Sequence, residues 1–399
     1  MKKLKIGVVI DGNIFAGGCF QQSLNAIKLL QNNNSENEFV IYTPKLSNKK
    51  KVHDLGLDVK LFKFSRKDRI VYKIRNKFFY MKWLMKIKWL RPFDEKFEKD
   101  GINILYFTGP SHYCLFLERL NYIVTVWDMC HRDYPIFPEV RNSFEFEARE
   151  NFLKVSLTKA FAIIVDSNLS KDNMSFRYGI DKDKIHIIAH SPVSISLNYN
   201  SEFTELIKNL IHQNKKYIFY PAQFWIHKNH SLILRSLNIL KNNHDLIIHA
   251  IFCGSDCGNL QSTLKLAEDL GIKNQIHYLG YISDEEIYLY YKNSFALVMP
   301  SFFGPTNLPP FEAMQYGIPV IVADLPGIRD QVGNAGLLTS PFDPENLARI
   351  IMDLYFDKTF YKTQITKGFK RIEEFSDQER IDTLNKIITS YSNFDLIWR

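Results

Sequence analysis

The chain has little cysteine and no long apolar run, and both shortages narrow what it can be. Its 399 residues include five cysteines, too few for a disulfide framework. Cys253 and Cys257 also lack a second pair at the spacing of a zinc site, so reduced thiols are expected. No window approaches 18 uncharged apolar residues, so no membrane-spanning helix is expected. The apolar run before Asp11 is too short for a secretory signal. These shortages predict a cytoplasmic protein.

What the chain does have is the composition of a globular protein. Hydrophobic residues make up 46% and charged residues 24% of the sequence. A chain of this length has room for two domains, each with its own core. The net charge of +8 is moderately basic, so the distribution of charge is more informative than its total.

Short apolar runs alternate with amphipathic stretches along the whole chain, which is the pattern of parallel sheets covered by helices. The expected strands lie at 5–10, 39–43, 59–64, 102–107, 122–127, 160–166 and 184–189, and then at 216–222, 246–254, 274–280, 294–300, 318–324 and 335–339. The polar, turn-rich stretch 191–203 separates the two series as a linker. The sequence therefore predicts an α/β protein with two Rossmann-like, doubly wound domains, at 1–195 and 204–375. A C-terminal helix at about 376–399 is expected to pack back on the first domain.

One stretch, GPTNLPPFEAMQYGIPVIVAD at 304–324, places a single carboxylate beside several prolines just before a buried strand. Pro309 and Pro310 favour a rigid turn that opens a helix, and Gly317 suits the C-terminal cap of that helix. A helix N-terminus attracts anions and hydroxyl-rich ligands. Glu312, expected in the first turn, would accept hydrogen bonds from a ligand's diol. On this stretch alone, the alternative that Glu312 only caps its own helix is equally good.

Three segments carry a resemblance to a known family: LPPFEAMQYGIPVIVADLPGIRDQVGNAGLL, DPENLA and YPAQFWIHKNH. They resemble the family-4 (group 1) glycosyltransferases of the GT-B fold, which move a sugar from a nucleotide donor with retention. The resemblance covers nearly all of the second domain and, more loosely, the first. It implies two Rossmann-like domains that face each other across a cleft.

The resemblance also assigns roles to individual residues. The family's glutamate that holds the donor ribose hydroxyls falls on Glu312, and its lysine that contacts the donor pyrophosphate falls on Lys228. A lysine and helix N-terminal amides can neutralise a departing diphosphate without a metal. The backbone N–H groups of Asn307 and Leu308 are the expected amide donors. A solvated lysine at a helix start is the alternative for Lys228.

Three positions depart from the family pattern. Gly304 stands where the first glutamate of the E-x7-E pair would be, and Gln223 replaces an arginine in the donor-binding set. Trp127 stands where relatives often have a histidine. His131 is a candidate for the missing imidazole, and Asp128 would orient it or contact the acceptor. The alternative for His131 is a loop histidine that caps a helix. The departures indicate either a rearranged site or lost activity.

Other candidates for the cleft come from loops that follow expected strands. Gly17 and Gly18 would let the backbone approach a ligand closely, although any tight turn uses such a pair. His112 follows another strand and is a candidate for donor or acceptor contact. Trp127 and Tyr134 would suit either a stacking platform for a sugar or the core.

The stretch 66–91 is strongly basic, with ten Lys or Arg residues against the single acidic residue Asp68. Its apolar residues recur at three- and four-residue steps, at Ile70, Ile74, Phe78, Met81, Met85 and Trp89. Such a helix can lie on an anionic membrane surface. A core-packed helix with a solvated basic face is the alternative, and no nucleic-acid module accompanies the stretch.

Taken together, the sequence predicts a retaining, metal-independent hexosyltransferase with a nucleotide-sugar donor and no other cofactor. Its acceptor would be a glycan, lipid-linked glycans included, in surface polysaccharide or lipopolysaccharide assembly. Its partners would be the donor, the acceptor and an anionic membrane, and nucleic acid is not expected as a partner. The protein would lie in the cytoplasm, at the inner face of the cell membrane. Two alternatives stay open, a GT-B nucleotide-sugar epimerase and a non-catalytic partner that binds sugar nucleotides.

Overall fold

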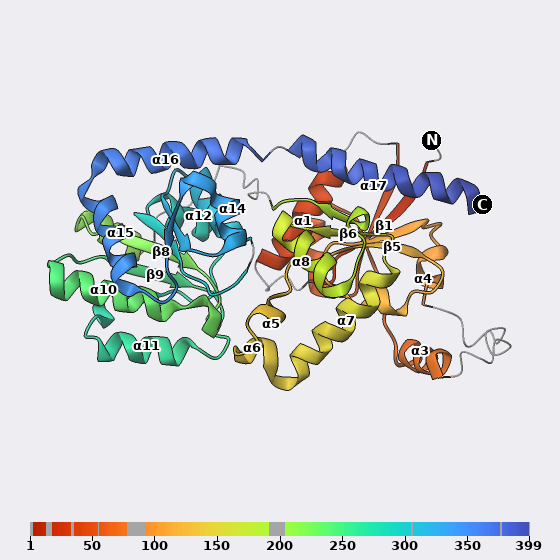
Figure 1. Cartoon of the computed structure of the whole chain (residues 1–399), viewed down its shortest axis with the longest axis horizontal. Coiled ribbons are helices and arrows are strands. Elements are labelled where there is room, and N and C mark those ends of the chain that lie inside the picture. The colour runs from red at the N-terminus through yellow and green to blue at the C-terminus, as the bar shows by residue number, and fades with distance from the viewer. Residues whose placement is uncertain are drawn as a thin grey trace. The chain divides into compact units, whose positions relative to one another are not determined.

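The chain forms two compact units, which differ from the expected domains in one segment. The computed structural model describes residues 3–12, 18–32, 36–54, 56–77, 93–190, 204–304, 306–375 and 377–398. Unit 1 comprises Met1–Met129, Glu147–Ala189 and Asp377–Arg399, and unit 2 comprises Cys130–Phe146 and His190–Ser376 (Figure 1). Cys130–Phe146, expected in the first domain, thus groups with unit 2. The expected linker 191–203 lies outside the described residues.

Unit 1 is built on a seven-stranded parallel sheet with the strand order β3-β2-β1-β4-β5-β6-β7. Its strands are β1 (Lys5–Val9), β2 (Glu38–Thr43), β3 (Val59–Leu61), β4 (Ile104–Phe107), β5 (Asn121–Thr125), β6 (Ala162–Val165) and β7 (Ile185–Ile187). Its main helices are α1 (Gly18–Gln31), α2 (Leu46–Asp54), α3 (Arg66–Lys77), α7 (Glu145–Lys159), α8 (Asn168–Tyr178) and α17 (Asp377–Trp398).

Both faces of this sheet are buried at its centre, which explains why β4 and β6 are continuous apolar runs. On β4, Leu105 and Phe107 point into one hydrophobic core, while Ile104 and Tyr106 point into the other. The C-terminal helix α17 contributes Leu384, Ile387, Ile388 and Tyr391 to the second core, and Figure 1 shows it running along this unit. The Tyr391 hydroxyl also donates to the carbonyl of Asn103 at 2.8 Å.

Unit 2 is built on a six-stranded parallel sheet with the strand order β10-β9-β8-β11-β12-β13. Its strands are β8 (Tyr217–Pro221), β9 (His249–Cys253), β10 (Ile276–Tyr278), β11 (Ala296–Met299), β12 (Val320–Ala323) and β13 (Gly336–Thr339). Its helices are α5 (Cys130–Asp133), α6 (Pro138–Arg141), α9 (Glu205–His212), α10 (His230–His244), α11 (Leu260–Asp269), α12 (Asp284–Lys292), α13 (Leu308–Gln315), α14 (Pro326–Val332), α15 (Pro344–Phe356) and α16 (Lys358–Glu373).

Each of the thirteen expected strands has a counterpart in the described structure, so the predicted α/β class is confirmed. The observed strands are mostly shorter, because the outer residues of each apolar run lie in the adjoining loops. Helix α7 begins at Glu145. The residues before it cannot extend the helix, since Ser143 and Phe144 take positive φ values of 59° and 62°.

The basic stretch forms a helix only partly as predicted. Helix α3 covers its first twelve residues, and residues 78–91 lie outside the described part of the chain. Val71 is buried, and the Tyr72 ring packs on Phe116 with ring centroids 4.6 Å apart. Ile70, expected on the packing face, is instead 46% exposed among the basic residues. This part of the stretch is therefore anchored to unit 1 through the neighbouring residues.

Candidate functional site

The candidate site lies where the strand order of the second sheet reverses. In doubly wound sheets, ligands bind beyond the carboxyl ends of the strands at such a point. Strand β8 pairs with β9 on one side and β11 on the other, so this rule selects the loops that follow β8 and β11. Lys228 lies in the first of these loops, and Gly304 lies in the second.

The loop that carries Lys228 is held by side chains on several sides. Lys228 ends a 3-10 turn, Ile226–Lys228, and Asn229 follows in the left-handed conformation with a φ of 57°. The Asn229 amide donates to the carbonyls of Pro300 and Pro341 at 3.1 and 2.8 Å. The Tyr220 hydroxyl donates to the Lys228 carbonyl at 3.1 Å. The Lys228 side chain, half-buried at the end of this turn, therefore projects from a fixed backbone.

A carboxylate that the sequence did not single out holds the same loop. Glu139 Oε1 accepts hydrogen bonds from the His227 backbone N–H at 2.9 Å and pairs with His227 Nδ1 at 2.6 Å. The His227 ring stacks on Phe303 at 3.9 Å between ring centroids. Burial on its own would raise the pKa of Glu139, but the hydrogen bonds from His227 outweigh burial and hold that pKa below its usual value. Glu139 is therefore a carboxylate at neutral pH.

His230, two residues after Lys228, is part of the core beneath the loop. Its ring has no exposed surface and stacks on Phe224 at 4.2 Å. Neither ring nitrogen has a hydrogen-bond partner within the described chain. Burial first, and then the positive charges of Lys228 and His227, lower the pKa of His230 to about 3. The imidazole is therefore neutral in the folded protein.

We expect His230 to make the fold sensitive to acid. In the unfolded chain a histidine titrates near its ordinary pKa of about 6.5, so stability is complete above that pH and is lost as the pH falls towards 3. By about pH 4.5 this loss should reach about 2–3 kcal/mol. His230→Phe should remove this loss, as measured by urea unfolding at about pH 7 and about pH 4.5. An unchanged difference between the two pH values would contradict the prediction. Other histidines titrate in both proteins and cancel in the comparison.

The loop after β11 contains a glycine that its backbone requires. Gly304 has a φ of 113°, a conformation that L side chains rarely adopt. A Cβ at this position would also lie 3.1 Å from the side-chain amide nitrogen, Nδ2, of Asn307. The loop in its present conformation therefore has no place for a glutamate at 304.

Asn307 does not offer its backbone N–H as the sequence predicted. That N–H donates to Gln331 Oε1 at 2.9 Å, and the Gln331 amide donates back to the Asn307 carbonyl. Helix α13 begins at Leu308, with Pro309 and Pro310 next. Since proline has no N–H, Leu308 carries the single backbone donor among the first three residues of α13. The expected pair of amide donors is thus reduced to one.

Glu312 lies further into the helix than predicted. It is the fifth residue of α13 and so belongs to the second turn. Its side chain is half-buried, and its Oε2 accepts a hydrogen bond from the Tyr291 hydroxyl at 2.9 Å. Burial first, and then the negative charge of Glu312, raise the pKa of Tyr291 well above its usual value. Tyr291 therefore remains a donor that fixes the Glu312 carboxylate.

Gln223, at the start of the loop after β8, is half-buried and bonded within the unit. Its side-chain carbonyl accepts a hydrogen bond from the Trp225 indole at 3.0 Å. This bond orients the amide but leaves no fixed positive charge at the position. A donor-binding role for Gln223 stays a prediction.

The candidates of unit 1 occupy separate positions. Asp128 forms an ion pair with Arg149 at 3.3 Å. His112 is exposed at the start of a 3-10 turn, His112–Phe116, and its ring lies 5.1 Å from that of Phe152. Helix α1 begins at Gly18, whereas Gly17 lies outside the described residues. The roles of these residues in the cleft stay predictions.

The side chain of His131 is more buried than that of a histidine that binds a ligand would be. It lies in the short helix α5 of unit 2, has no exposed surface, and packs its ring against Phe146. The Tyr134 ring stacks on Phe303 at 5.7 Å within the same unit. Burial argues against direct contact of His131 with a substrate, and its catalytic role stays a prediction.

Asp11 is a further polar residue that sequence reasoning missed. It follows β1, and its carboxylate accepts a hydrogen bond from the Ser111 hydroxyl at 2.9 Å. Burial raises the pKa of Asp11, although the bond to Ser111 and the charges of Lys45 and His112 oppose the shift. These groups follow strands β1, β2 and β4, around the strand-order reversal of the first sheet. That shared edge is the signal that could have found them.

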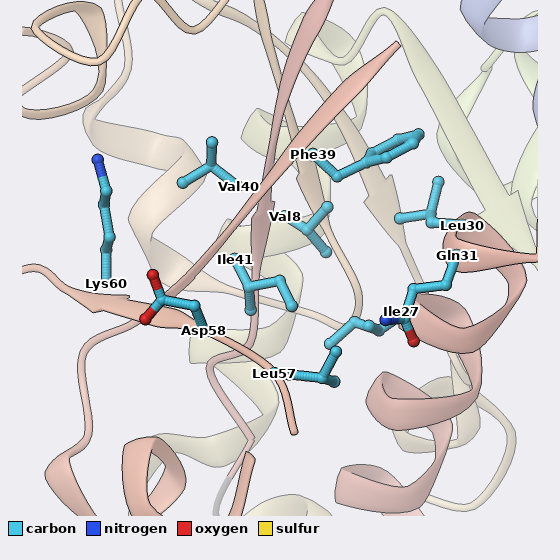
Figure 2. A pocket seen from close by; sticks show the side chains of 10 residues that line it. All are labelled: Val8, Ile27, Leu30, Gln31, Phe39, Val40, Ile41, Leu57, Asp58 and Lys60. Carbon is cyan, nitrogen blue, oxygen red and sulfur yellow. The ribbon is translucent and has the colours of Figure 1, made fainter. Parts of the chain in front are cut away.

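Unit 1 also contains a cavity of about 310 Å³ between helix α1 and the edge of its sheet. Figure 2 shows Ile27 and Leu30 of α1 on one side of it and Lys60 of β3 on another. Its lining is mostly apolar and includes none of the candidate site residues.

Within the described ranges, no three His, Cys, Asp or Glu side chains cluster as metal ligands. Among the described helices, none combines the length and apolarity needed to cross a bilayer.

Known proteins are similar to this chain in sequence. The family model for glycosyl transferases group 1 matches residues 202–371, which include the loops after β8 and β11. This part of the chain is therefore similar to the group 1 glycosyltransferases. The chain is 26% identical to the O-antigen chain mannosyltransferase RfbU of Salmonella typhimurium over 70% of its own length and 71% of RfbU. It is 24% identical to the O-antigen chain mannosyltransferase B of Escherichia coli, over 67% and 70% of the two chains.

Solved structures confirm the GT-B fold of the chain. HepE of Anabaena, solved in complex with UDP-glucose, superposes with a TM-score of 0.70 at 16% identity, covering 97% of this chain and 100% of HepE. A glycosyltransferase from Rickettsia africae gives a TM-score of 0.69, also at 16% identity, with 98% and 99% covered. At this level of identity the likeness concerns the fold alone.

Proposed function

We propose that this glycosyltransferase moves a hexose, with mannose as the first candidate, from a nucleotide sugar to a hydroxyl of a glycan in surface polysaccharide assembly. The observation that carries the proposal is the meeting of two loops at the strand-order reversal of unit 2. One presents Lys228 on a fixed backbone, and the other leads into α13, where Tyr291 orients the carboxylate of Glu312. The O-antigen mannosyltransferases among its relatives support mannose and a glycan acceptor.

In this proposal different residues bind different parts of the donor. Glu312 accepts hydrogen bonds from the ribose diol, and the hydrogen bond from Tyr291 fixes the orientation of its carboxylate. Lys228 and the Leu308 N–H stabilise the charge that develops on the diphosphate as the glycosidic bond breaks. The acceptor attacks on the face from which the diphosphate leaves, and a donor phosphate oxygen takes the acceptor's proton. Transfer then proceeds with retention and without a side-chain nucleophile or a metal.

Thermal unfolding with a panel of UDP-, GDP-, dTDP- and CMP-sugars tests the proposal. A donor at 100 times its dissociation constant should stabilise the fold by about 2.7 kcal/mol. The donor that binds is then incubated with and without glycan acceptors. Turnover that requires an acceptor supports transfer, whereas turnover without one indicates an epimerase. Binding without any turnover indicates a non-catalytic partner, and no binding across the panel refutes the proposed donor site.

We further propose that α3 attaches the glycosyltransferase to an anionic membrane, where lipid-linked acceptors lie. Its exposed residues include Arg66, Lys67, Arg69 and Lys73 beside the exposed Ile70. Each basic residue near an anionic surface contributes about 1 kcal/mol.

Reversing three of these charges should release the protein from vesicles. Lys67→Glu with Arg69→Glu and Lys73→Glu should weaken binding to phosphatidylserine vesicles by roughly 100-fold, measured by co-sedimentation. The matched control reverses Lys358, Lys362 and Lys370, which are exposed on α16. Equal loss in both variants would show that net charge, not α3, drives attachment. Donor binding should be unchanged in both.

A further inference from the structure

We propose that Glu139 is a positioning residue for sugar transfer, because it fixes, through His227, the loop that presents Lys228. The inference rests on the proposed role of Lys228 at the donor diphosphate. It adds a residue from a distant part of the chain, since Glu139 precedes His227 by 88 positions. Glu139 lies on α6, in the segment Cys130–Phe146 that groups with unit 2.

The pair formed by Glu139 and His227 is almost fully shielded from solvent. The two side chains are 7% and 10% exposed, and a carboxylate so deeply buried is costly unless its charge is compensated. Here the same oxygen, Oε1, meets the backbone N–H and the ring Nδ1 of one residue. The contact thus fixes both the main chain and the ring angle of His227. As a carboxylate can only accept, it also favours the tautomer with the proton on Nδ1.

The remaining sides of His227 are also held. Its ring lies nearly parallel to that of Phe303, with 17° between the planes. Phe137, two residues before Glu139, packs edge-on against the rings of both His227 and Phe303. The His227 carbonyl accepts the backbone N–H of Phe302 at 2.8 Å. Every polar group of its backbone and one face of its ring are therefore constrained.

These constraints act on Lys228 because the two residues are adjacent in one 3-10 turn. Loss of the Glu139 carboxylate removes the acceptor of the His227 N–H and the partner of its ring Nδ1. The turn then samples orientations in which the Lys228 ammonium misses the diphosphate, and small misplacements of a charged group strongly reduce catalysis. Glu139 thus acts without touching the substrate.

A double-mutant cycle between Glu139 and Lys228 tests the inference. Glu139→Ala should lower kcat at saturating donor by at least roughly tenfold in the wild-type background, but by less than about twofold when Lys228 is already alanine. Glu139→Gln keeps an oxygen acceptor and should recover most of the activity. Glu147→Gln, an exposed glutamate of α7, is the matched control and should behave as wild type.

Hydrogen exchange supplies a readout that does not depend on activity. The amide of His227 should exchange faster in Glu139→Ala and close to normally in Glu139→Gln. Equal effects of Glu139→Ala in the two backgrounds, or an unchanged His227 amide, would overturn the inference while leaving the proposed function intact. If Glu139→Ala does not fold, Glu139→Leu replaces it in the cycle, because leucine also removes both acceptor oxygens but keeps most of the side-chain volume. Equal effects of Glu139→Leu in the two Lys228 backgrounds would overturn the inference. If Lys228→Ala keeps full activity, the proposed role of Lys228 at the diphosphate fails, and the inference fails with it, although sugar transfer itself is not refuted.

Discussion

Replacing Lys228 by alanine is expected to reduce kcat by about 10²–10³-fold, the range for removing one preorganised group that stabilises transition-state charge. In the proposed reaction the departing diphosphate gains negative charge as the glycosidic bond breaks, and the half-buried Lys228 ammonium compensates that charge. The backbone of the loop should survive the change. The Tyr220 hydroxyl bonds to the Lys228 carbonyl, and the Lys228 N–H bonds to the Trp225 carbonyl at 3.1 Å. The measurement is steady-state kinetics with the donor found in the panel.

Two further variants make this result specific. Lys228→Arg keeps the charge on a differently shaped group, so it should retain more activity than Lys228→Ala. Lys216→Ala removes an exposed lysine just before β8 and should leave kcat unchanged. Full activity of Lys228→Ala, with an unchanged melting temperature, would show that the diphosphate is stabilised elsewhere.

The sheets of this protein were predictable because the information lies in short segments. The central strands, such as β4, β6, β9, β11 and β12, are apolar runs buried on both faces, and such a run can be recognised without knowing its neighbours. The placement of Cys130–Phe146 was not predictable in this way. It depends on contacts such as that of Phe137 with Phe303, which join residues far apart in the sequence.

In the candidate site, too, residues within local motifs were predictable from the sequence and long-range contacts were not. Lys228 and Glu312 stand in local motifs, so the sequence could propose them. Glu139 bonds to His227, the neighbour of Lys228, and Tyr291 bonds to Glu312, and no spacing rule links Glu139 or Tyr291 to the motifs. For the Asn307 N–H, a local motif led to a wrong prediction. A helix start suggested a free donor, but Gln331, 24 residues further on, satisfies both backbone groups of Asn307.

Glu312→Ala is expected to weaken donor binding by about 1.5–3 kcal/mol, the range for hydrogen bonds to a charged group. This corresponds to roughly 10- to 150-fold in the dissociation constant, measured by calorimetry. The same change also leaves the buried Tyr291 hydroxyl with only a long contact to the Pro309 carbonyl at 3.5 Å. A loss of stability of about 1–3 kcal/mol should therefore accompany the loss of binding.

Tyr291→Phe separates these two effects. It removes the internal hydrogen bond but keeps the Glu312 carboxylate, so stability should fall by about 1 kcal/mol while donor affinity changes by less than about threefold. In the double variant no hydroxyl is left unpaired, so stability should recover most of what Glu312→Ala lost. Donor affinity should stay as low as in Glu312→Ala. If affinity instead returned together with stability, Glu312 would be a structural partner of Tyr291 rather than the acceptor of the donor's diol.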